Sequence, residues 1–104
     1  MTIRLPVIFV GLLLVGCARA PRNLEAARSP FDGEYLAYDA TGAAVQRTIW
    51  NRDKLVAAWE RNDSASRSWT RVAQDGNGVI KVYYRGGHAG FNWFENGEFV
   101  RGAG

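Results

Sequence analysis

Two side chains of this sequence could carry chemistry by themselves: the thiol of Cys17 and the imidazole of His88. A thiol can act as a nucleophile, and an imidazole can act as a general acid or base near neutral pH. Each is the only residue of its type among the 104 residues. The sequence therefore excludes an internal disulfide and a site with several histidine ligands, and we expect no metal site and no cofactor.

His88 stands in a glycine-rich segment, Gly86–Gly90, which we interpret as an exposed loop. Small neighbours would let a target approach the ring closely, so His88 is a candidate binding residue. The carboxylates of Glu95 and Glu98 flank one tight turn, which is a poor cleft for paired acid and base catalysis. Because no Ser stands in a nucleophile elbow and no glycine loop opens a helix, we expect a protein that is not an enzyme.

The segment before Cys17 has the composition of an export signal. A single positive charge, Arg4, precedes an apolar run over residues 5–15, which Pro6 interrupts. This run is about ten residues long, whereas a membrane-spanning helix needs roughly 20. The segment therefore predicts a signal peptide over residues 1–16 that is removed after export.

The residues directly before the cysteine indicate the kind of signal. Cys17 is preceded by Leu14, Val15 and Gly16, and this pattern resembles the lipobox of bacterial lipoproteins. The resemblance implies that the Cys17 thiol receives a diacylglyceryl group and that the new amino terminus is acylated. Several acyl chains, each contributing about 0.8 kcal/mol per buried CH₂, hold a protein on a membrane effectively permanently. Ala18 follows where an Asp would resemble an inner-membrane retention signal, so we expect the outer membrane, on its periplasmic side.

The basic character of the chain lies near its amino terminus. The formal net charge is +3 and the sequence pI is about 9.4. Residues 17–31 hold three arginines and one glutamate, whereas residues 32–104 hold nine basic and nine acidic residues. A domain without net charge has no electropositive field for nucleic acid. We interpret residues 17–31 as a lipidated terminus followed by a short solvated tether.

Residues 32–104 are long enough for one small domain. Alternation and turn residues predict short strands over residues 34–38, 43–50, 68–74, 79–85, 91–95 and 98–101. Leu55, Val56 and Trp59 form an apolar stripe with helical spacing, which predicts a helix over residues 52–61 with Asn51 as its cap. We therefore expect an α+β domain in which one helix packs on a small antiparallel sheet of about five to six short strands.

Turn residues set the expected pairing of the last strands. Asp75-Gly76-Asn77-Gly78 and Asn96-Gly97 are strong hairpin signals. A five-residue loop over Gly86–Gly90 would place Tyr83 opposite Trp93. Side chains alternate across a sheet, so one face would be core and the other would carry an aromatic set. That set is Tyr83, Arg85, Phe91 and Trp93.

This aromatic set allows two interpretations. Rigid rings beside an arginine are frequent in binding hot spots and can stack on sugar rings, so the set is a candidate binding face. Alternatively, the hairpin of residues 34–50 folds over it and makes it core. The expected function is that of a lipid-anchored, non-enzymatic envelope protein that binds a protein or peptidoglycan through this face. The alternative function is an inhibitor or exclusion factor against a hydrolase, phage or mating partner, acting through Gly86–Gly90.

Overall fold

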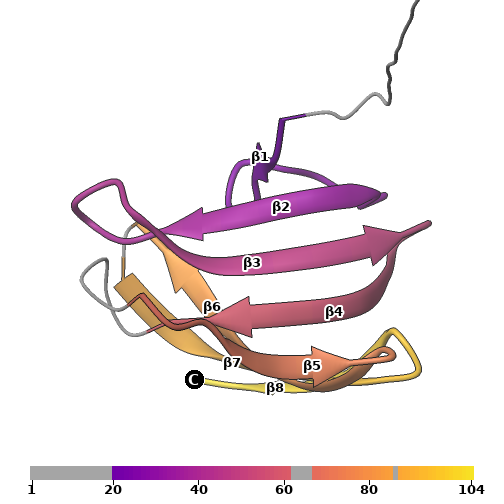
Figure 1. Cartoon of the computed structure of the whole chain (residues 1–104). Helices are drawn as coiled ribbons and strands as arrows, with labels where there is room; N and C mark the ends of the chain where they lie inside the picture. The colour runs from indigo at the N-terminus through magenta and orange to yellow at the C-terminus, as the bar shows by residue number, and fades with distance from the viewer. Residues whose placement is uncertain (1–19, 62–66, 86) are drawn as a thin grey trace, which may run out of the picture.

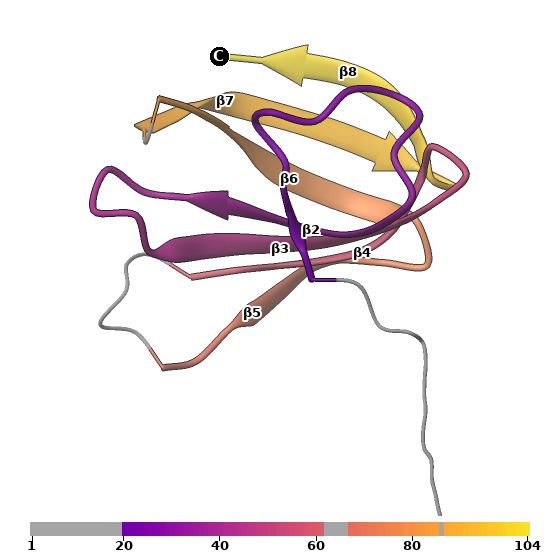
Figure 2. The same ribbon diagram turned by 90° about the horizontal axis from the view of Figure 1, so that it is seen from above.

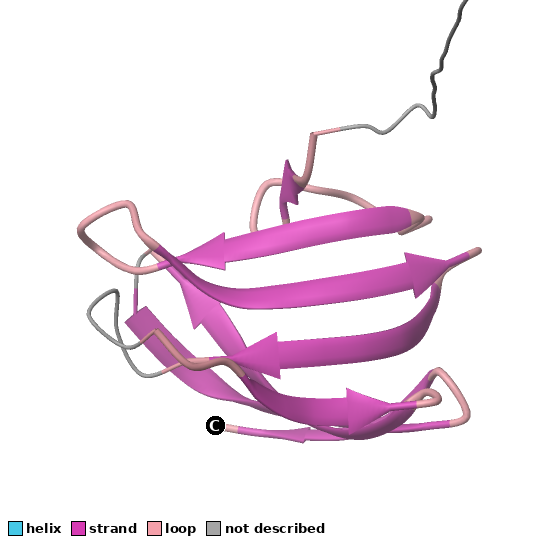
Figure 3. Ribbon diagram, in the orientation of Figure 1, coloured by secondary structure: helices cyan, strands magenta, loops and turns pink. Residues whose placement is uncertain are grey.

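The fold is a single curled sheet. The computed structural model describes residues 20–61, 67–85 and 87–104. Its strands are β1 (Arg22–Asn23), β2 (Gly33–Tyr38), β3 (Ala44–Asn51), β4 (Lys54–Glu60), β5 (Thr70–Gln74), β6 (Asn77–Tyr84), β7 (Gly87–Glu95) and β8 (Glu98–Ala103). They lie side by side in their order along the chain, and every pair is antiparallel except β1 with β2. The meander bends into half of a barrel (Figures 1 and 3).

The expected α+β class is wrong, because the described part of the chain forms an 8-stranded sheet and contains no helix. The helix predicted over residues 52–61 is strand β4. Arg52 and Asp53, with φ of 51° and 70°, form a two-residue turn that joins β3 to β4. Positive φ at both central residues matches the twist of the flanking strands. The apolar stripe from Leu55 to Trp59 is too short for the spacing of its residues to distinguish a helix from the alternation of a strand.

The strands expected elsewhere are present, with ends that differ by a few residues. The composition of these segments explains why they form strands, since β-branched and aromatic residues such as those of β3 pack well on the half-buried face of a pleated sheet. The Asn96-Gly97 turn is confirmed, and Phe94 pairs with Phe99 across it.

The hairpin of β6 and β7 is tighter than expected. Tyr84 already pairs with Gly87, so Val79 rather than Tyr83 lies opposite Trp93. The loop predicted over Gly86–Gly90 is therefore wrong, because β7 begins at Gly87. A glycine-rich run suggested a loop, but the backbone pairs through it.

The core lies on the concave side of the curled sheet. Its buried members are Tyr35, Trp50, Leu55, Ala58, Ala73, Ile80 and Phe94. Fully burying a large apolar side chain contributes about 1.5–3 kcal/mol. The core thus joins strands from both ends of the meander, which holds the sheet in its curled shape.

Residues 22–31, here called the strap, cross the open side of the half-barrel toward β6 and β7 (Figure 2). The amide of Leu24 donates to the carbonyl of Leu36 over 2.8 Å. Leu24, Ala27 and Phe31 pack against the core. The segment expected to be a solvated tether over residues 17–31 is thus packed against the sheet from Arg22 onward.

The turn between β3 and β4 holds the far end of the strap. The Asp53 carboxylate accepts hydrogen bonds from the Ser29 hydroxyl and the Phe31 amide, each over 2.9 Å. The Asp53 amide in turn donates to the Phe31 carbonyl over 2.6 Å. These contacts explain why an Arg-Asp pair occupies a turn that more often contains Asn-Gly.

The Glu60 side chain and the Lys81 backbone, here called the polar bridge, are hydrogen-bonded across the gap where β5 separates from β6. These two strands pair only at Ala73–Gly78 and Gln74–Asn77. The buried carboxylate of Glu60 accepts a hydrogen bond from the backbone amide of Lys81 over 2.7 Å. Side chains therefore satisfy backbone groups that a longer strand pairing would otherwise satisfy.

Candidate functional site

Four aromatic side chains form a chain of ring contacts on β6 and β7. The ring centroids of Phe91 and Trp93 are 6.3 Å apart, and those of His88 and Phe91 are 4.7 Å apart in an edge-to-face arrangement. The Tyr83 ring lies 6.4 Å from His88. We call Tyr83, His88, Phe91 and Trp93 the aromatic row. Its spacing falls within the range of favourable aromatic pairs.

The row belongs to the face of β7 that points away from the core. Phe94 is buried in the core, and Phe91 and Trp93 stand at odd separations from it, so their side chains point to the opposite face. Phe91 keeps 37% of its surface exposed. Within the described residues, β2 and β3 pair only with each other and with β1 and β4, and neither pairs with β6 or β7.

Arg101 completes the row on β8. It pairs with Trp93, and its guanidinium carbon lies 4.2 Å from the centroid of the Trp93 ring. The sequence did not predict this residue because a bulge between Trp93 and Phe94 shifts the register of β8. An arginine stacked on a tryptophan is a favourable cation–π contact of about 0.5–1 kcal/mol at an exposed position.

Arg85, expected on the same face, lies apart from the row. Its guanidinium carbon is 5.3 Å from the Tyr84 ring centroid. Its amide donates to the Glu25 carboxylate of the strap over 2.8 Å. Arg85 thus helps hold the strap, with a backbone φ of 52° at the end of β6.

His88 is an exposed strand residue. Its Nε2 lies 2.9 Å from the carbonyl oxygen of Gly90, and its ring packs on Phe91. The Tyr83 ring is the second aromatic neighbour of His88. His88 therefore belongs to the aromatic row through its ring contacts.

Tyr83 lies where the row meets the polar bridge. Burial, together with the negative charge of Glu60, raises the pKa of the Tyr83 hydroxyl to about 12. The hydroxyl therefore stays protonated at neutral pH and can donate a hydrogen bond. Tyr83 is the one member of the row that also lines a cavity on the concave side of the sheet.

Two surface depressions flank the row. One, of about 410 Å³, lies between His88, Phe91 and Ala103 at the end of β8. The other, of about 480 Å³, lies beside Trp93 and Arg101. A partner group that projects from a surface could enter either depression while the rings support it from the side.

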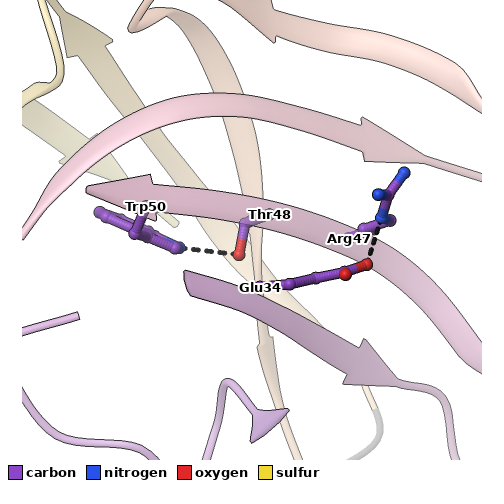
Figure 4. Close-up of polar contacts among 4 residues, drawn as sticks. All are labelled: Glu34, Arg47, Thr48 and Trp50. Carbon is purple, nitrogen blue, oxygen red and sulfur yellow. Dashed lines mark hydrogen bonds and ion pairs between the residues drawn. The ribbon is translucent and has the colours of Figure 1, made fainter. Parts of the chain in front are cut away.

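The concave cavity is larger, about 730 Å³, and lies between the strap and β6–β8. Trp50 and Phe94 are among its lining residues, and their ring centroids are 5.6 Å apart. The indole nitrogen of Trp50 donates to the Thr48 hydroxyl over 2.8 Å (Figure 4), so this ring offers the cavity its apolar surface. Arg47, also on β3, forms an ion pair with Glu34 of β2 (Figure 4).

The remaining expectations concern metals, membranes and the lipobox. Within residues 20–61, 67–85 and 87–104, no group of three or more His, Cys, Asp or Glu side chains could hold a metal ion. The same residues contain no helix that is long and apolar enough to cross a membrane. Leu14, Val15, Gly16 and Cys17 lie outside the described residues.

No protein-family model matches this chain, and neither a curated protein nor a solved structure matches it.

Proposed function

We propose that this protein is a lipid-anchored envelope lipoprotein that binds a protein or peptidoglycan through the aromatic row. The observation that carries the proposal is the row itself. Four rings and Arg101 stand in contact on a sheet face that points away from the core. Aromatic residues and arginine are enriched at the positions that dominate the energetics of binding interfaces. Aromatic rings bury large areas with few rotatable bonds.

The anchor in this proposal rests on the lipobox resemblance. Incorporation of a labelled fatty acid into the chain tests it, and Cys17→Ala should abolish that incorporation. Retention of the label in Cys17→Ala would contradict the anchor without affecting the proposed binding face.

Site-specific photocrosslinking in cells tests the binding face. A photoreactive aromatic residue replaces Phe91 or Trp93 in the full lipidated chain, and we expect a discrete adduct from both positions. Trp59 is the matched control, because it is a tryptophan of the same sheet but lies between Arg47 and Arg71, each 4.8 Å from its ring. Equal adducts from position 59, or none from positions 91 and 93, would overturn the proposal.

Sedimentation with purified peptidoglycan separates the two classes of partner. If glycan is the partner, the chain should sediment with peptidoglycan, and Phe91→Ala should weaken this by about tenfold, as expected for a hot-spot ring. If a protein is the partner, the crosslinked adduct has a defined mass and sedimentation stays at background.

The inhibitor or exclusion alternative has less support. It required a projecting loop at Gly86–Gly90, and β7 occupies the range from Gly87. A strand within a sheet cannot insert into a target's cleft as a free loop can.

A further inference from the structure

Strand β8 is an open edge of the sheet. It lies last in the strand order and, among the described residues, pairs with β7 alone. All 6 of its residues, Glu98–Ala103, are exposed. An edge strand presents a row of backbone N–H and C=O groups without strand partners, and the natural complement of such a row is another β-strand.

The usual protections of an edge strand are weak in β8. Natural edges often carry a lysine or a proline that disfavours pairing with another chain, and β8 contains neither. Its two charged side chains are engaged within the protein, because Glu98 forms an ion pair with Lys54 and the Arg101 guanidinium stacks on Trp93. Between these charges lie two apolar residues, Phe99 and Val100, which keep 58% and 49% of their surface exposed. A strand added to β8 would remove part of this apolar surface from water.

The opposite edge of the sheet differs from β8. It is formed by β1, which is 2 residues long and belongs to the strap. Short strands protect an edge, because they offer few groups for pairing. An assembly through β8 alone therefore stops at two copies, as a closed dimer with two-fold symmetry does.

The bulge in β8 makes this strand complementary to its own copy. Phe99 and Gly102 pair with Phe94 and Asn92, which are two residues apart on β7, so both lie on the concave side. In a regular strand, residues three apart would point to opposite faces, and the extra residue of the bulge removes this conflict. When two copies of β8 overlap antiparallel along their whole length, Phe99 of each copy lies opposite Gly102 of the other. The two paired residues then share a face, as an antiparallel pair requires.

The same overlap keeps like charges apart. It places Val100 of one copy opposite Arg101 of the other, and Glu98 opposite Ala103. A register centred on Arg101 would instead set two arginines directly opposite each other, which is destabilising. The side-chain pattern therefore favours the register of full overlap.

We propose that two copies of this chain pair antiparallel through β8, with Phe99 of each copy opposite Gly102 of the other. The pairing continues the sheet across both molecules and keeps their two aromatic rows on the same side of it. β7 of one copy lies three strand spacings, about 14 Å, from β7 of the other. A partner with repeated binding groups can then contact both rows at once. The pairing does not depend on what the aromatic row binds, so it can hold or fail independently of the proposed function.

Cysteine crosslinking in intact cells tests the pairing. Two differently tagged copies of the full chain are co-expressed, each with Val100→Cys. The two Cα atoms at position 100 should lie about 6 Å apart, within the range of a disulfide, so we expect mild oxidation to link the two tags. Val56→Cys is the matched control, because Val56 is another exposed valine of the sheet, on β4. The unsubstituted chain measures any background from Cys17. No linked pair from position 100, or an equal yield from position 56, would overturn the proposal.

A charge at position 100 tests the register. Val100→Lys places a cation opposite Arg101 of the other copy, and the two-fold symmetry repeats this contact, so the dimer should weaken about tenfold. Val100→Glu places a carboxylate at the same exposed position, where it complements Arg101, and its dimer should stay within about threefold of the parent. Sedimentation equilibrium of the purified full chain in detergent measures the dissociation constants. A monomeric parent chain, or equal weakening by both substitutions, would contradict the proposed pairing.

Discussion

The amide of Gln46 on β3 donates a hydrogen bond over 2.8 Å to the carboxylate of Glu60 on β4, and both side chains are buried. The same amide nitrogen donates to the Lys81 carbonyl over 2.7 Å, while Glu60 accepts from the Lys81 amide. Three strands are thereby joined at the point where β5 separates from β6. The low dielectric of the protein interior strengthens the hydrogen bonds of such a network. It also raises the free-energy cost of leaving any of these buried polar groups without a partner.

Glu60→Ala should lower the free energy of unfolding by about 2–3 kcal/mol, because the Lys81 amide would be buried without an acceptor. Glu60→Gln keeps an acceptor oxygen at the same place, and its new amide can donate to Gln46 Oε1, which has no hydrogen-bond partner among the residues that the structure describes. We therefore expect a smaller loss for Glu60→Gln. Urea unfolding of both variants measures the difference, and equal losses would show that the hydrogen bond to Lys81 contributes little.

Asp53→Ala should release the strap, because the Ser29 hydroxyl and the Phe31 amide lose their acceptor. We expect a loss of about 2 kcal/mol in stability, as for hydrogen bonds to a charged group. Hydrogen exchange should accelerate over residues 22–31 and stay unchanged in β7. Asp53→Asn is the control, since asparagine tolerates the positive φ and retains one acceptor oxygen. Unchanged exchange in the alanine variant would mean that the apolar contacts of the strap are sufficient.

Gly76→Ala should destabilise the fold more than Gly42→Ala. Both glycines have positive φ, 82° and 86°, so alanine is strained at either position. A Cβ on Gly76 would lie 2.4 Å from the Gly97 amide nitrogen, whereas a Cβ on Gly42 meets nothing within 4 Å. We expect a loss of about 1 kcal/mol at Gly42 and clearly more at Gly76. Thermal unfolding measures both, and equal losses would rule out the close approach of the two turns.

One tyrosine should titrate at about pH 12, because burial and Glu60 raise the pKa of Tyr83 to that value. The protonated form is the favoured one in the folded state. Its contribution to stability is therefore present below the ordinary tyrosine pKa of about 10 and is lost as the pH rises from there through 12. Ultraviolet absorbance of tyrosinate detects the step. Tyr83→Phe should remove it, Tyr84→Phe should leave it, and persistence of the step in Tyr83→Phe would refute the assignment.

Most strands could be predicted from the sequence because their turns are local signals. Asn96-Gly97 determined the last hairpin, including the pairing of Phe94 with Phe99. The β3–β4 hairpin could not be predicted in this way. Its turn residues, Arg52 and Asp53, are unusual at positive φ, and the contacts that hold Asp53 come from residues more than 20 positions earlier in the chain.

The candidate site was predictable in part. Phe91 and Trp93 lie two residues apart on β7, so they share a face in any register. The β6–β7 pairing differs from the expected one by an even number of residues, so Tyr83 still lies on that face. The prediction that Arg85 lies on the same face was wrong, because the chain turns immediately after Tyr84. Arg101 and the concave cavity depend on a bulge in β8 and on the packing of the strap, which no local pattern indicates.

The strap also limits where the protein can act. β1 begins at Arg22, and five residue steps separate it from Cys17. Such a stretch spans at most about 18 Å when fully extended. If Cys17 is acylated, the half-barrel could move only within a thin layer of solvent next to the bilayer that holds it. A partner would have to reach that layer, so peptidoglycan next to the membrane and the parts of membrane proteins on the same side of the bilayer are the first candidates to search.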